Sequence, residues 1–328
     1  MKAVIIGVSG HFDLALSVRD RIPQVRFAAI APGSDGEDAR AVHQSHLEGI
    51  GSVYDGDFRV MLDREKPDVA VVAPVFDLQA SIAIECMQRG VPVFLEKPMA
   101  LDLEELGRLR RSRDAAGVAL CPMMATRYAP EFYAAYQAVH AGLIGEPILV
   151  TAQKSYRLGS RAWYYRTRAS YGGTIPWVGI HAIDLIHWFT GGGIVDVCAR
   201  HTRRENGGNG EMESSAACVF RLANSGMAVA TCDFLRPRAA STHGDDRIRV
   251  AGSTGVVEVR DGEAMVTTAE RPLEKLPVAP PASIFVDFIG FLEGGAPPRI
   301  TADEAFDICG IALKSRDAAD TGEVVRTR

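Results

Sequence analysis

The sequence predicts an α/β protein with two domains: a doubly wound parallel sheet, followed by a domain built on a mainly antiparallel sheet. In the first third of the chain, continuous apolar strands alternate with helical segments, which favours a parallel sheet covered on both faces. Further on, strand-like runs follow one another with few helices between them, which favours antiparallel pairing. With 328 residues, the chain is also long enough for two cores, since single cores rarely grow far beyond about 250 residues.

The first domain is predicted to span residues 1–122. Its expected strands are the short apolar runs Lys2–Ile6, Val25–Ala31, Asp68–Ala73 and Val91–Leu95. Its expected helices are Asp13–Arg21, Leu78–Arg89 and Asp102–Ala116. The last of these begins with a capping box, because Glu105 follows Asp102 at the spacing that lets each satisfy the other's backbone.

The second domain is predicted to span residues 123–328. Its expected strands are Ile148–Tyr156, Ala216–Leu222, Met227–Phe234, Ile248–Ala251 and Val256–Val259. The glycine-rich segment Asn206–Gly210 fits a hairpin tip. A last helix is expected after Thr301, where Thr301 and Glu304 form a second capping box.

Composition favours a small molecule as the main partner. The formal net charge of −5 argues against nucleic acid or an acidic membrane, both of which require a strong positive field. The six cysteines show no C-x-x-C pattern, so we expect reduced core residues and no metal site. We find neither a signal peptide nor a membrane-spanning run and expect a cytoplasmic protein.

The stretch VIIGVSGHF places a glycine at the end of the first strand, where a turn into a helix can cradle a pyrophosphate. A full dinucleotide fingerprint reads G-x-G-x-x-G, and here Ser9 and Phe12 stand at the second and third glycine positions. An ordinary tight turn is the alternative. The candidate cofactor-binding residues of this turn are Gly7, Ser9, Gly10, His11 and Phe12.

The end of the second strand lacks the acid that usually binds the ribose of NAD. Ala31 and Pro32 stand at that point, and Asp35 comes about three residues late. Ser34 can bond a 2′-phosphate and Arg40 lies near it in sequence. The cofactor is therefore expected to be NAD or NADP, with a slight preference for NADP.

Glu96, Lys97 and Pro98 directly follow a buried strand, and this group resembles the Glu-Lys-Pro motif of the Gfo/Idh/MocA family, the glucose-fructose oxidoreductases and inositol dehydrogenases. Other features stand in register along essentially the whole chain. They are Pro74, Gly90, Arg127-Tyr128 with Pro130, Gly142–Pro147 and Gly172–Trp188.

The resemblance implies a Rossmann domain followed by an α/β domain with a large open sheet, assembled as a homodimer or homotetramer. It also implies hydride transfer between a nicotinamide and a hydroxyl or carbonyl carbon of a sugar, polyol or sugar acid. Lys97 matches the family lysine that contacts the substrate hydroxyl and the cofactor, and Glu96 and Pro74 are expected beside the cofactor. A cation at the hydroxyl favours the alkoxide as the proton leaves.

The stretch GGTIPWVGIHAIDLIHW matches a family segment in its glycine pair, in His181 and in Asp184. Asp184 lies one helical turn after His181 and can orient a ring nitrogen, which predicts a catalytic pair; a core histidine is the alternative. Trp177 replaces the family aspartate, either as a wall for a sugar ring or as core filling. The chain is thus a dehydrogenase with altered substrate geometry, or a relative that has lost the reaction and binds cofactor or sugar as a sensor.

The segment QKSYRLGSRAWYYRTRASY carries five basic residues and no acid. It is either an arm paired with acidic neighbours or a grip for an anionic substrate, since guanidinium groups bind carboxylate and phosphate. A nucleic-acid surface or scaffold is a third alternative, which the net negative charge disfavours. The candidate substrate-binding residues are Arg127, Tyr156, Arg166, Trp177 and His181.

Overall fold

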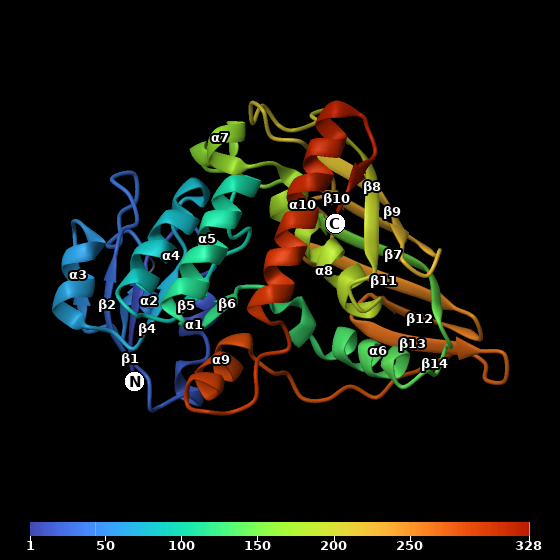
Figure 1. The fold of residues 1–328 in the computed structure, drawn as a ribbon, viewed down its shortest axis with the longest axis horizontal. Helices are drawn as coiled ribbons and strands as arrows, with labels where there is room; N and C mark the ends of the chain where they lie inside the picture. The colour runs from blue at the N-terminus through green and yellow to red at the C-terminus, as the bar shows by residue number, and fades with distance from the viewer. Residues whose placement is uncertain (43, 328) are drawn as a thin grey trace. The chain divides into compact units, whose positions relative to one another are not determined.

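The computed structural model describes residues 1–42 and 44–327, and the chain forms two compact units. The first comprises residues 1–125 and 283–306, and the second comprises residues 126–282 and 307–328 (Figure 1). The predicted boundary at residue 122 is close to the end of the first segment. The segment 283–306, however, belongs to the first unit, whereas the sequence assigned it to the second domain.

A six-stranded parallel sheet forms the first unit, in the order β3-β2-β1-β4-β5-β6. The strands are β1 (Lys2–Ile6), β2 (Arg26–Ala31), β3 (Ser52–Val53), β4 (Val69–Val72), β5 (Val93–Leu95) and β6 (Leu120–Pro122). The predicted doubly wound sheet is therefore confirmed. The strand order reverses between β1 and β4, and ligands of such sheets bind at this switch point, beyond the carboxyl ends of the strands.

The helices of the first unit are α1 (Asp13–Leu16), α2 (Gln44–Leu47), α3 (Phe58–Glu65), α4 (Gln79–Gln88) and α5 (Leu103–Ala116), with α9 (Ile284–Leu292) from the returning segment. The first predicted helix is interrupted after Leu16 and continues as a 3₁₀ turn at Arg19–Arg21. At α5 the Asp102 carboxylate accepts the Glu105 N–H at 2.7 Å, as the capping prediction requires.

Aromatic packing explains why the chain returns to the first unit. Phe285 of α9 packs on Phe94 of β5, with ring centroids 5.0 Å apart, and on Phe27 of β2 at 6.3 Å. Phe288 also stacks on Phe94, at 6.0 Å. Burying a phenylalanine side chain stabilises a fold by about 1.5–3 kcal/mol, and two of them are buried here.

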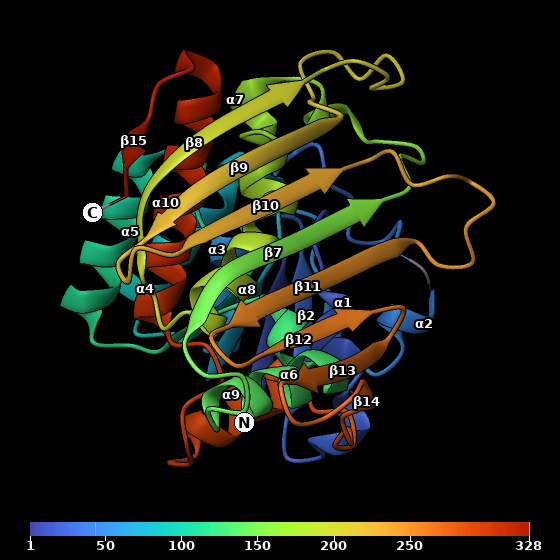
Figure 2. The same cartoon turned by 90° about the vertical axis from the view of Figure 1, so that its right-hand side faces the viewer.

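The second unit contains a nine-stranded sheet in the order β14-β13-β12-β11-β7-β10-β9-β8-β15, seen face on in Figure 2. The strands are β7 (Pro147–Tyr156), β8 (Ile194–Thr202), β9 (Ser215–Leu222), β10 (Met227–Asp233), β11 (Gly244–Gly252), β12 (Gly255–Arg260), β13 (Glu263–Thr268), β14 (Glu274–Lys275) and β15 (Val325–Arg326). Neighbours are antiparallel except β7 and β10, which are parallel. The mainly antiparallel sheet is confirmed, and Asn206–Gly210 lies in the β8–β9 connection as expected.

Helices of the second unit are α6 (Pro130–His140), α7 (Arg168–Tyr171), α8 (Ile180–Phe189) and most of α10 (Ala302–Thr321), with a π-helical turn at Ile175–Gly179 and 3₁₀ turns at Ala125–Tyr128 and Trp163–Tyr165. Helix α8 packs against β7 and β10, and all its residues are buried, which explains its apolar sequence. The predicted cap of α10 is present, since Glu304 N donates to Thr301 Oγ1 at 3.2 Å and Thr301 N donates back to Glu304.

The six cysteines are free thiols, and five of them are buried. Cys198 is exposed, because it lies on an outward-facing position of β8, and it departs from the predicted set of core cysteines. In the described part of the chain, no helix combines the length and the apolarity that a membrane span requires.

Candidate functional site

The turn after β1 lies at the switch point of the parallel sheet and leaves no room for side chains. Gly7 has φ +83°, and a Cβ there would come within 2.3 Å of the Pro74 backbone. A Cβ on Gly10 would lie 2.6 Å from Glu96 Oε2. The backbone of this turn can therefore approach a ligand closely, which is the geometry that a dinucleotide site requires.

Glu96 ties the glycine turn to the Glu-Lys-Pro loop after β5. Its buried carboxylate accepts the backbone N–H of His11 and lies 2.6 Å from His11 Nδ1. Its other oxygen accepts the Lys97 N–H at 2.8 Å. Burial, the largest influence, raises the pKa of Glu96, but His11 and Lys97 together outweigh it and hold this pKa below its usual value.

Lys97 brings a buried ammonium to the same edge of the sheet. Its side chain is 2% exposed, and the Lys97–Pro98 bond is cis. The loop is anchored by Gln79 of α4, whose amide, oriented with its nitrogen toward the loop, donates to the carbonyls of Glu96 and Pro98. These contacts bring Gly7, Gly10 and His11 of the turn together with Pro74, Glu96 and Lys97. The ring of Phe12 instead packs against His46.

A carboxylate that the sequence prediction missed lies beside the end of β2. Glu37 accepts the N–H of Val8 at 3.0 Å and the N–H of Gly33 at 2.7 Å, and it also accepts the Ser9 hydroxyl. It joins the β1 turn to the β2 turn, at the place where dinucleotide-binding folds hold the adenosine ribose. The loop brings Glu37 six residues beyond Ala31 back to that position.

An open cavity of about 400 Å³ adjoins Glu37. Asp35, Asp55 and Asp57 also line it, together with one base, Arg59, so that acidic side chains outnumber basic ones. The Ser34 hydroxyl there is buried and has no hydrogen-bond partner among the described residues. Arg40, which the sequence offered to a 2′-phosphate, is instead held by Asp55 through two hydrogen bonds of 2.5 and 2.7 Å.

In the second unit, the glycine pair leads from α7 into the π-helical turn before α8. Gly172 has φ +76° and Gly173 φ +116°, and a Cβ on Gly173 would lie 2.3 Å from Arg168 Nη1. Arg168 Nη1 donates to the Gly172 carbonyl at 3.1 Å, and Arg316 of α10 donates to the same carbonyl at 3.2 Å. Gly173 is therefore required by the Arg168 side chain that packs against it, and glycine is favoured at Gly172 by its left-handed backbone.

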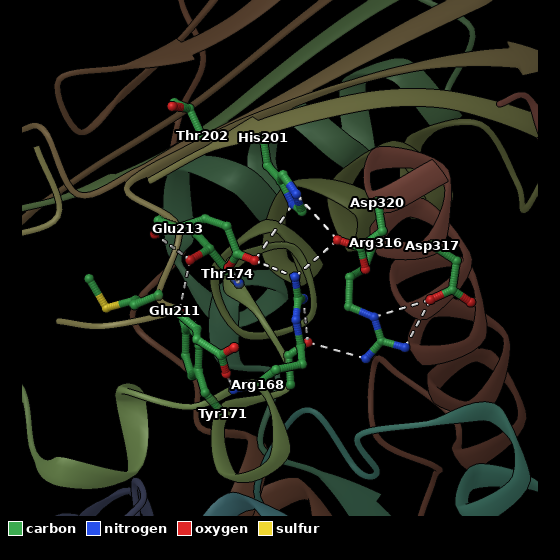
Figure 3. A network of polar contacts seen from close by, with 12 residues as sticks. Arg168, Tyr171, Thr174, His201, Thr202, Glu211, Glu213, Arg316, Asp317 and Asp320 are labelled. Carbon is green, nitrogen blue, oxygen red and sulfur yellow. Dashed lines mark hydrogen bonds and ion pairs between the residues drawn. The ribbon is translucent and has the colours of Figure 1, made fainter. Parts of the chain in front are cut away.

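Figure 3 shows the polar network that holds this turn. The Glu213 carboxylate is 1% exposed, accepts the Thr174 N–H at 2.9 Å and pairs with Arg168 at 2.6 Å. Arg168 also pairs with Asp320 of α10 at 3.0 Å. His201 of β8 lies 3.3 Å from the same aspartate. The network thereby fixes the entry to α8 from three separate parts of the second unit.

His181 and Asp184 both lie on α8, and each contacts a residue of the segment before α6. His181 Nδ1 lies 3.4 Å from the Thr126 hydroxyl, and the His181 side chain is buried. The Asp184 carboxylate pairs with Arg127, whose Nε donates to it at 2.9 Å. A pairing of Asp184 with His181 therefore remains a prediction. His187, expected to be structural, is buried near the carboxyl end of α8.

Arg127 is fully buried and packs over the Trp188 ring at 5.3 Å, besides pairing with Asp184. These contacts make it part of the interior of the second unit. Trp177 lies in the π-helical turn, 5% exposed, with its ring edge-to-face with Tyr165 at 6.0 Å. In this structure its contacts are those of a core residue, which corresponds to the core-filling alternative.

Most of the basic segment is engaged locally. Lys154 pairs with Asp246, and Arg161 lies over the rings of Phe234 and Tyr165, at 4.4 and 5.3 Å. Tyr156 stacks between Phe234 and His243. Arg166 is exposed. The arm interpretation thus describes Lys154 and Arg168, whereas Arg157 remains unexplained by it.

Several residues of the site carry no signal in the sequence. Glu37 and Gln79 stand in no motif, and their roles depend on how loops close across the sheet. Glu213 lies in a polar stretch that reads as an ordinary turn. Only the acidic run at residues 35–38 indicated that a carboxylate lies near the second strand.

Residues 1–123 match the family described as "Oxidoreductase family, NAD-binding Rossmann fold", and residues 132–258 match "GFO/IDH/MocA C-terminal domain". A solved structure from Thermotoga maritima, assigned as an oxidoreductase, is 39% identical, with a TM-score of 0.94, and the match covers 99% of this chain and 100% of that one.

Two curated relatives are more distant. The rhizopine catabolism protein MocA of Rhizobium meliloti is 26% identical over 94% of this chain and 96% of its own length. Inositol 2-dehydrogenase of Rubrobacter xylanophilus is 27% identical over 60% of this chain, and the match spans about half (54%) of that protein. The two family matches together cover most of the chain, and the chain belongs to the GFO/IDH/MocA family of NAD-binding oxidoreductases.

Proposed function

We propose that the chain is a nicotinamide-dependent dehydrogenase that interconverts a hydroxyl and a carbonyl on a sugar, a polyol or a sugar acid. The observation that carries the proposal is Lys97, a buried ammonium beside the glycine turn at the switch point of the NAD-binding sheet. Here it stands in the motif that the family uses at the reacting hydroxyl.

The residues of this chain have separable tasks in that reaction. Lys97 donates to the substrate oxygen and stabilises the alkoxide that forms as the proton leaves. His181 is the proposed general base, and the Thr126 hydroxyl beside Nδ1 helps to fix its ring. When bound, the nicotinamide supplies the hydride acceptor. The proton leaves with His181 while the hydride leaves from carbon, so that the alcohol becomes a carbonyl.

The residues at the switch point fit a dinucleotide, and we propose NAD over NADP. The Ser34 hydroxyl, buried without a described partner, and the Glu37 carboxylate suit two ribose hydroxyls. A 2′-phosphate would instead face a cavity in which four carboxylates outnumber one guanidinium, that of Arg59, while Arg40 is held by Asp55. Like charges in one site are unfavourable, which reverses the slight preference for NADP drawn from the sequence.

We also propose a cytoplasmic homo-oligomer that uses the open face of the nine-stranded sheet. Val219 of β9 is 47% exposed, and Met227, the first residue of the neighbouring β10, is 55% exposed. Such a patch favours burial against another copy. Equilibrium sedimentation of the purified chain measures the assembly.

The function is tested by titrating the full-length chain with NADH and with NADPH to measure binding. Turnover is then followed by nicotinamide absorbance, with NAD⁺ or NADP⁺ and a panel of neutral and acidic sugars and polyols. We expect tighter binding of NADH and turnover on at least one member of the panel. Cofactor binding without any turnover would favour the sensor alternative, in which the fold binds cofactor or sugar and the reaction is lost. An absence of cofactor binding would contradict both.

A further inference from the structure

A pocket of about 690 Å³ lies at the end of the sheet in the second unit, between the segment after β7 and the segment after β10. Three arginines line it: Arg157 on one side, and Arg236 and Arg238 on the other. Ser160 adds a hydroxyl, and Phe234 and Leu158 add apolar walls. Three guanidinium groups around one cavity are uncommon in a chain with a net charge of −5.

The positive charge of this arginine pocket is only partly neutralised within its own unit. Arg236 lies 3.0 Å from Asp245, but that carboxylate is shared with Arg247. Arg157 and Arg238 form no ion pair with an acidic side chain among the described residues of the unit. The Arg157 Nε is buried and has no hydrogen-bond partner there, although its Nη2 donates to the Ala240 carbonyl.

The neighbouring residues indicate the same sign of charge. Arg161 stacks on Phe234, a wall of the pocket, at 4.4 Å and likewise has a buried Nε without a described partner. The pKa of His243, which stacks on Tyr156, is lowered by burial first and then by Arg161, Arg157 and Lys154. Protonation of His243 to its charged form is therefore disfavoured, as expected where the potential is positive.

The arginine pocket adjoins the part of the second unit that carries the proposed base. Arg236 also lines a second cavity, of about 440 Å³, whose wall includes Thr126 and four acidic residues, Glu131, Asp245, Asp246 and Asp261. The Thr126 hydroxyl is the group recorded beside His181 Nδ1. Arg236 is thus the lining residue that the two cavities share.

We propose that the arginine pocket binds the anionic group, carboxylate or phosphate, of the substrate, so that the enzyme acts on a sugar acid or a phosphorylated sugar. This assignment of substrate class rests on the proposed dehydrogenase function. Guanidinium groups offer paired N–H donors that match both anions, and partly buried sites strengthen such bonds. Anion binding thereby gives a role to Arg157, whose positive charge no acidic side chain neutralises among the described residues of the unit.

The test is calorimetric titration of the full-length chain, without cofactor, with D-glucose, D-glucuronate and D-glucose 6-phosphate at low and high salt. We expect at least one of the two anions to bind about tenfold or more tightly than D-glucose, and salt to weaken it. The stronger of the two identifies carboxylate or phosphate as the group recognised. Equal affinity for the anions and for D-glucose overturns the proposal.

Two variants locate the binding. Arg238→Gln changes an exposed residue without described partners and is expected to weaken the anion by about tenfold, as is Arg157→Gln. Arg249→Gln, on an exposed position of β11, is the matched control and leaves the affinity unchanged. Anion affinity that survives Arg238→Gln and Arg157→Gln overturns the assignment. Intact anion binding without turnover would refute the dehydrogenase function and leave the pocket standing.

Discussion

At the scale of single residues, two buried or half-buried glutamates organise the cofactor end. Glu96 holds the glycine turn through His11, and Glu37 joins that turn to the end of β2. The glycine fingerprint is incomplete at Ser9 and Phe12, yet the positions that do require glycine are occupied by it. The close backbone approach at the glycines and the positions of Glu37 and Glu96 are therefore stronger evidence for a dinucleotide site than the incomplete glycine fingerprint.

Replacing Glu37 with glutamine is expected to shift cofactor preference toward NADPH. Glu37→Gln keeps the shape and a carbonyl acceptor for Val8 or Gly33 but removes the negative charge that a 2′-phosphate would face. We expect the ratio of NADPH to NADH affinity to rise by about tenfold, the equivalent of roughly 1.4 kcal/mol. Fluorescence titration with both cofactors measures it.

Glu48→Gln serves as the control, because Glu48 is an exposed acid of the same unit and lines no described cavity. It should leave the ratio unchanged. A wild-type chain that already binds NADPH more tightly than NADH would contradict the role given to Glu37.

Among single residues, Lys97 was predictable and Glu37 was not. Lys97 directly follows an apolar strand inside a recognisable motif, so its position at the sheet edge follows from the strand itself. Glu37 lies in an irregular loop after β2, where no period relates sequence distance to direction. Its carboxylate is held beside the sheet by the N–H groups of Val8 and Gly33 and by the Ser9 hydroxyl.

At the scale of elements, the entry to α8 depends on the ion pair between Arg168 and Glu213. Arg168→Ala leaves the Glu213 carboxylate, 1% exposed, without its guanidinium partner. Breaking a buried pair from one side costs about 3–5 kcal/mol, and the partial exposure of Arg168 reduces this to roughly 2 kcal/mol. Urea unfolding of the purified variant measures the loss.

Two comparisons give this prediction its specificity. Arg203→Ala changes an exposed arginine near the same hairpin and should alter the free energy of unfolding by less than about 0.5 kcal/mol. In the double variant Arg168→Ala with Glu213→Gln, the loss should be smaller than the sum of the single losses. Strict additivity would show that the two side chains do not stabilise each other.

Strand β11 carries an acid-sensitive contact. A hydrogen bond from Arg247 is the main reason that the pKa of Asp245 lies below its ordinary value; burial opposes the shift, and Arg236 adds to it. Because the folded pKa is the lower one, the stabilisation is present above the unfolded pKa of about 3.9 and is lost as the pH falls through the folded value.

We therefore expect Asp245→Asn to lower stability at pH 7 and to flatten its decline below about pH 4. Urea unfolding at a series of pH values compares it with Asp261→Asn, whose side chain is 73% exposed. An Asp245 variant with the same pH profile as the wild type would argue against a stabilising pair.

The elements of the fold divide clearly into predictable and unpredictable ones. The buried strands β1, β4 and β5 and the capped helices α5 and α10 follow from apolar runs and from caps. Strand β8 follows a run of glycines, and buried and exposed positions alternate only weakly along it. Strands β14 and β15 have two residues each, too few to show a hydrophobic period.

At the scale of the whole molecule, the sequence did not predict that the chain leaves the second unit and returns to the first. The segment 283–306 returns to the first unit because Phe285 and Phe288 of α9 find Phe94 there. An apolar helix is predicted to be buried, but its sequence does not indicate which of two cores it packs against. Similarly, the parallel pairing of β7 with β10 depends on the order of non-consecutive strands.

The central claim is that this chain transfers hydride through a site built around Lys97. The most direct measurement is steady-state turnover of Lys97→Ala, with NAD⁺ and the best substrate of the panel, beside Lys275→Ala as an exposed control. We expect turnover to fall by at least about a thousandfold in Lys97→Ala and to be unchanged in Lys275→Ala, with both variants folded by circular dichroism. Turnover of Lys97→Ala at the wild-type rate would contradict the account.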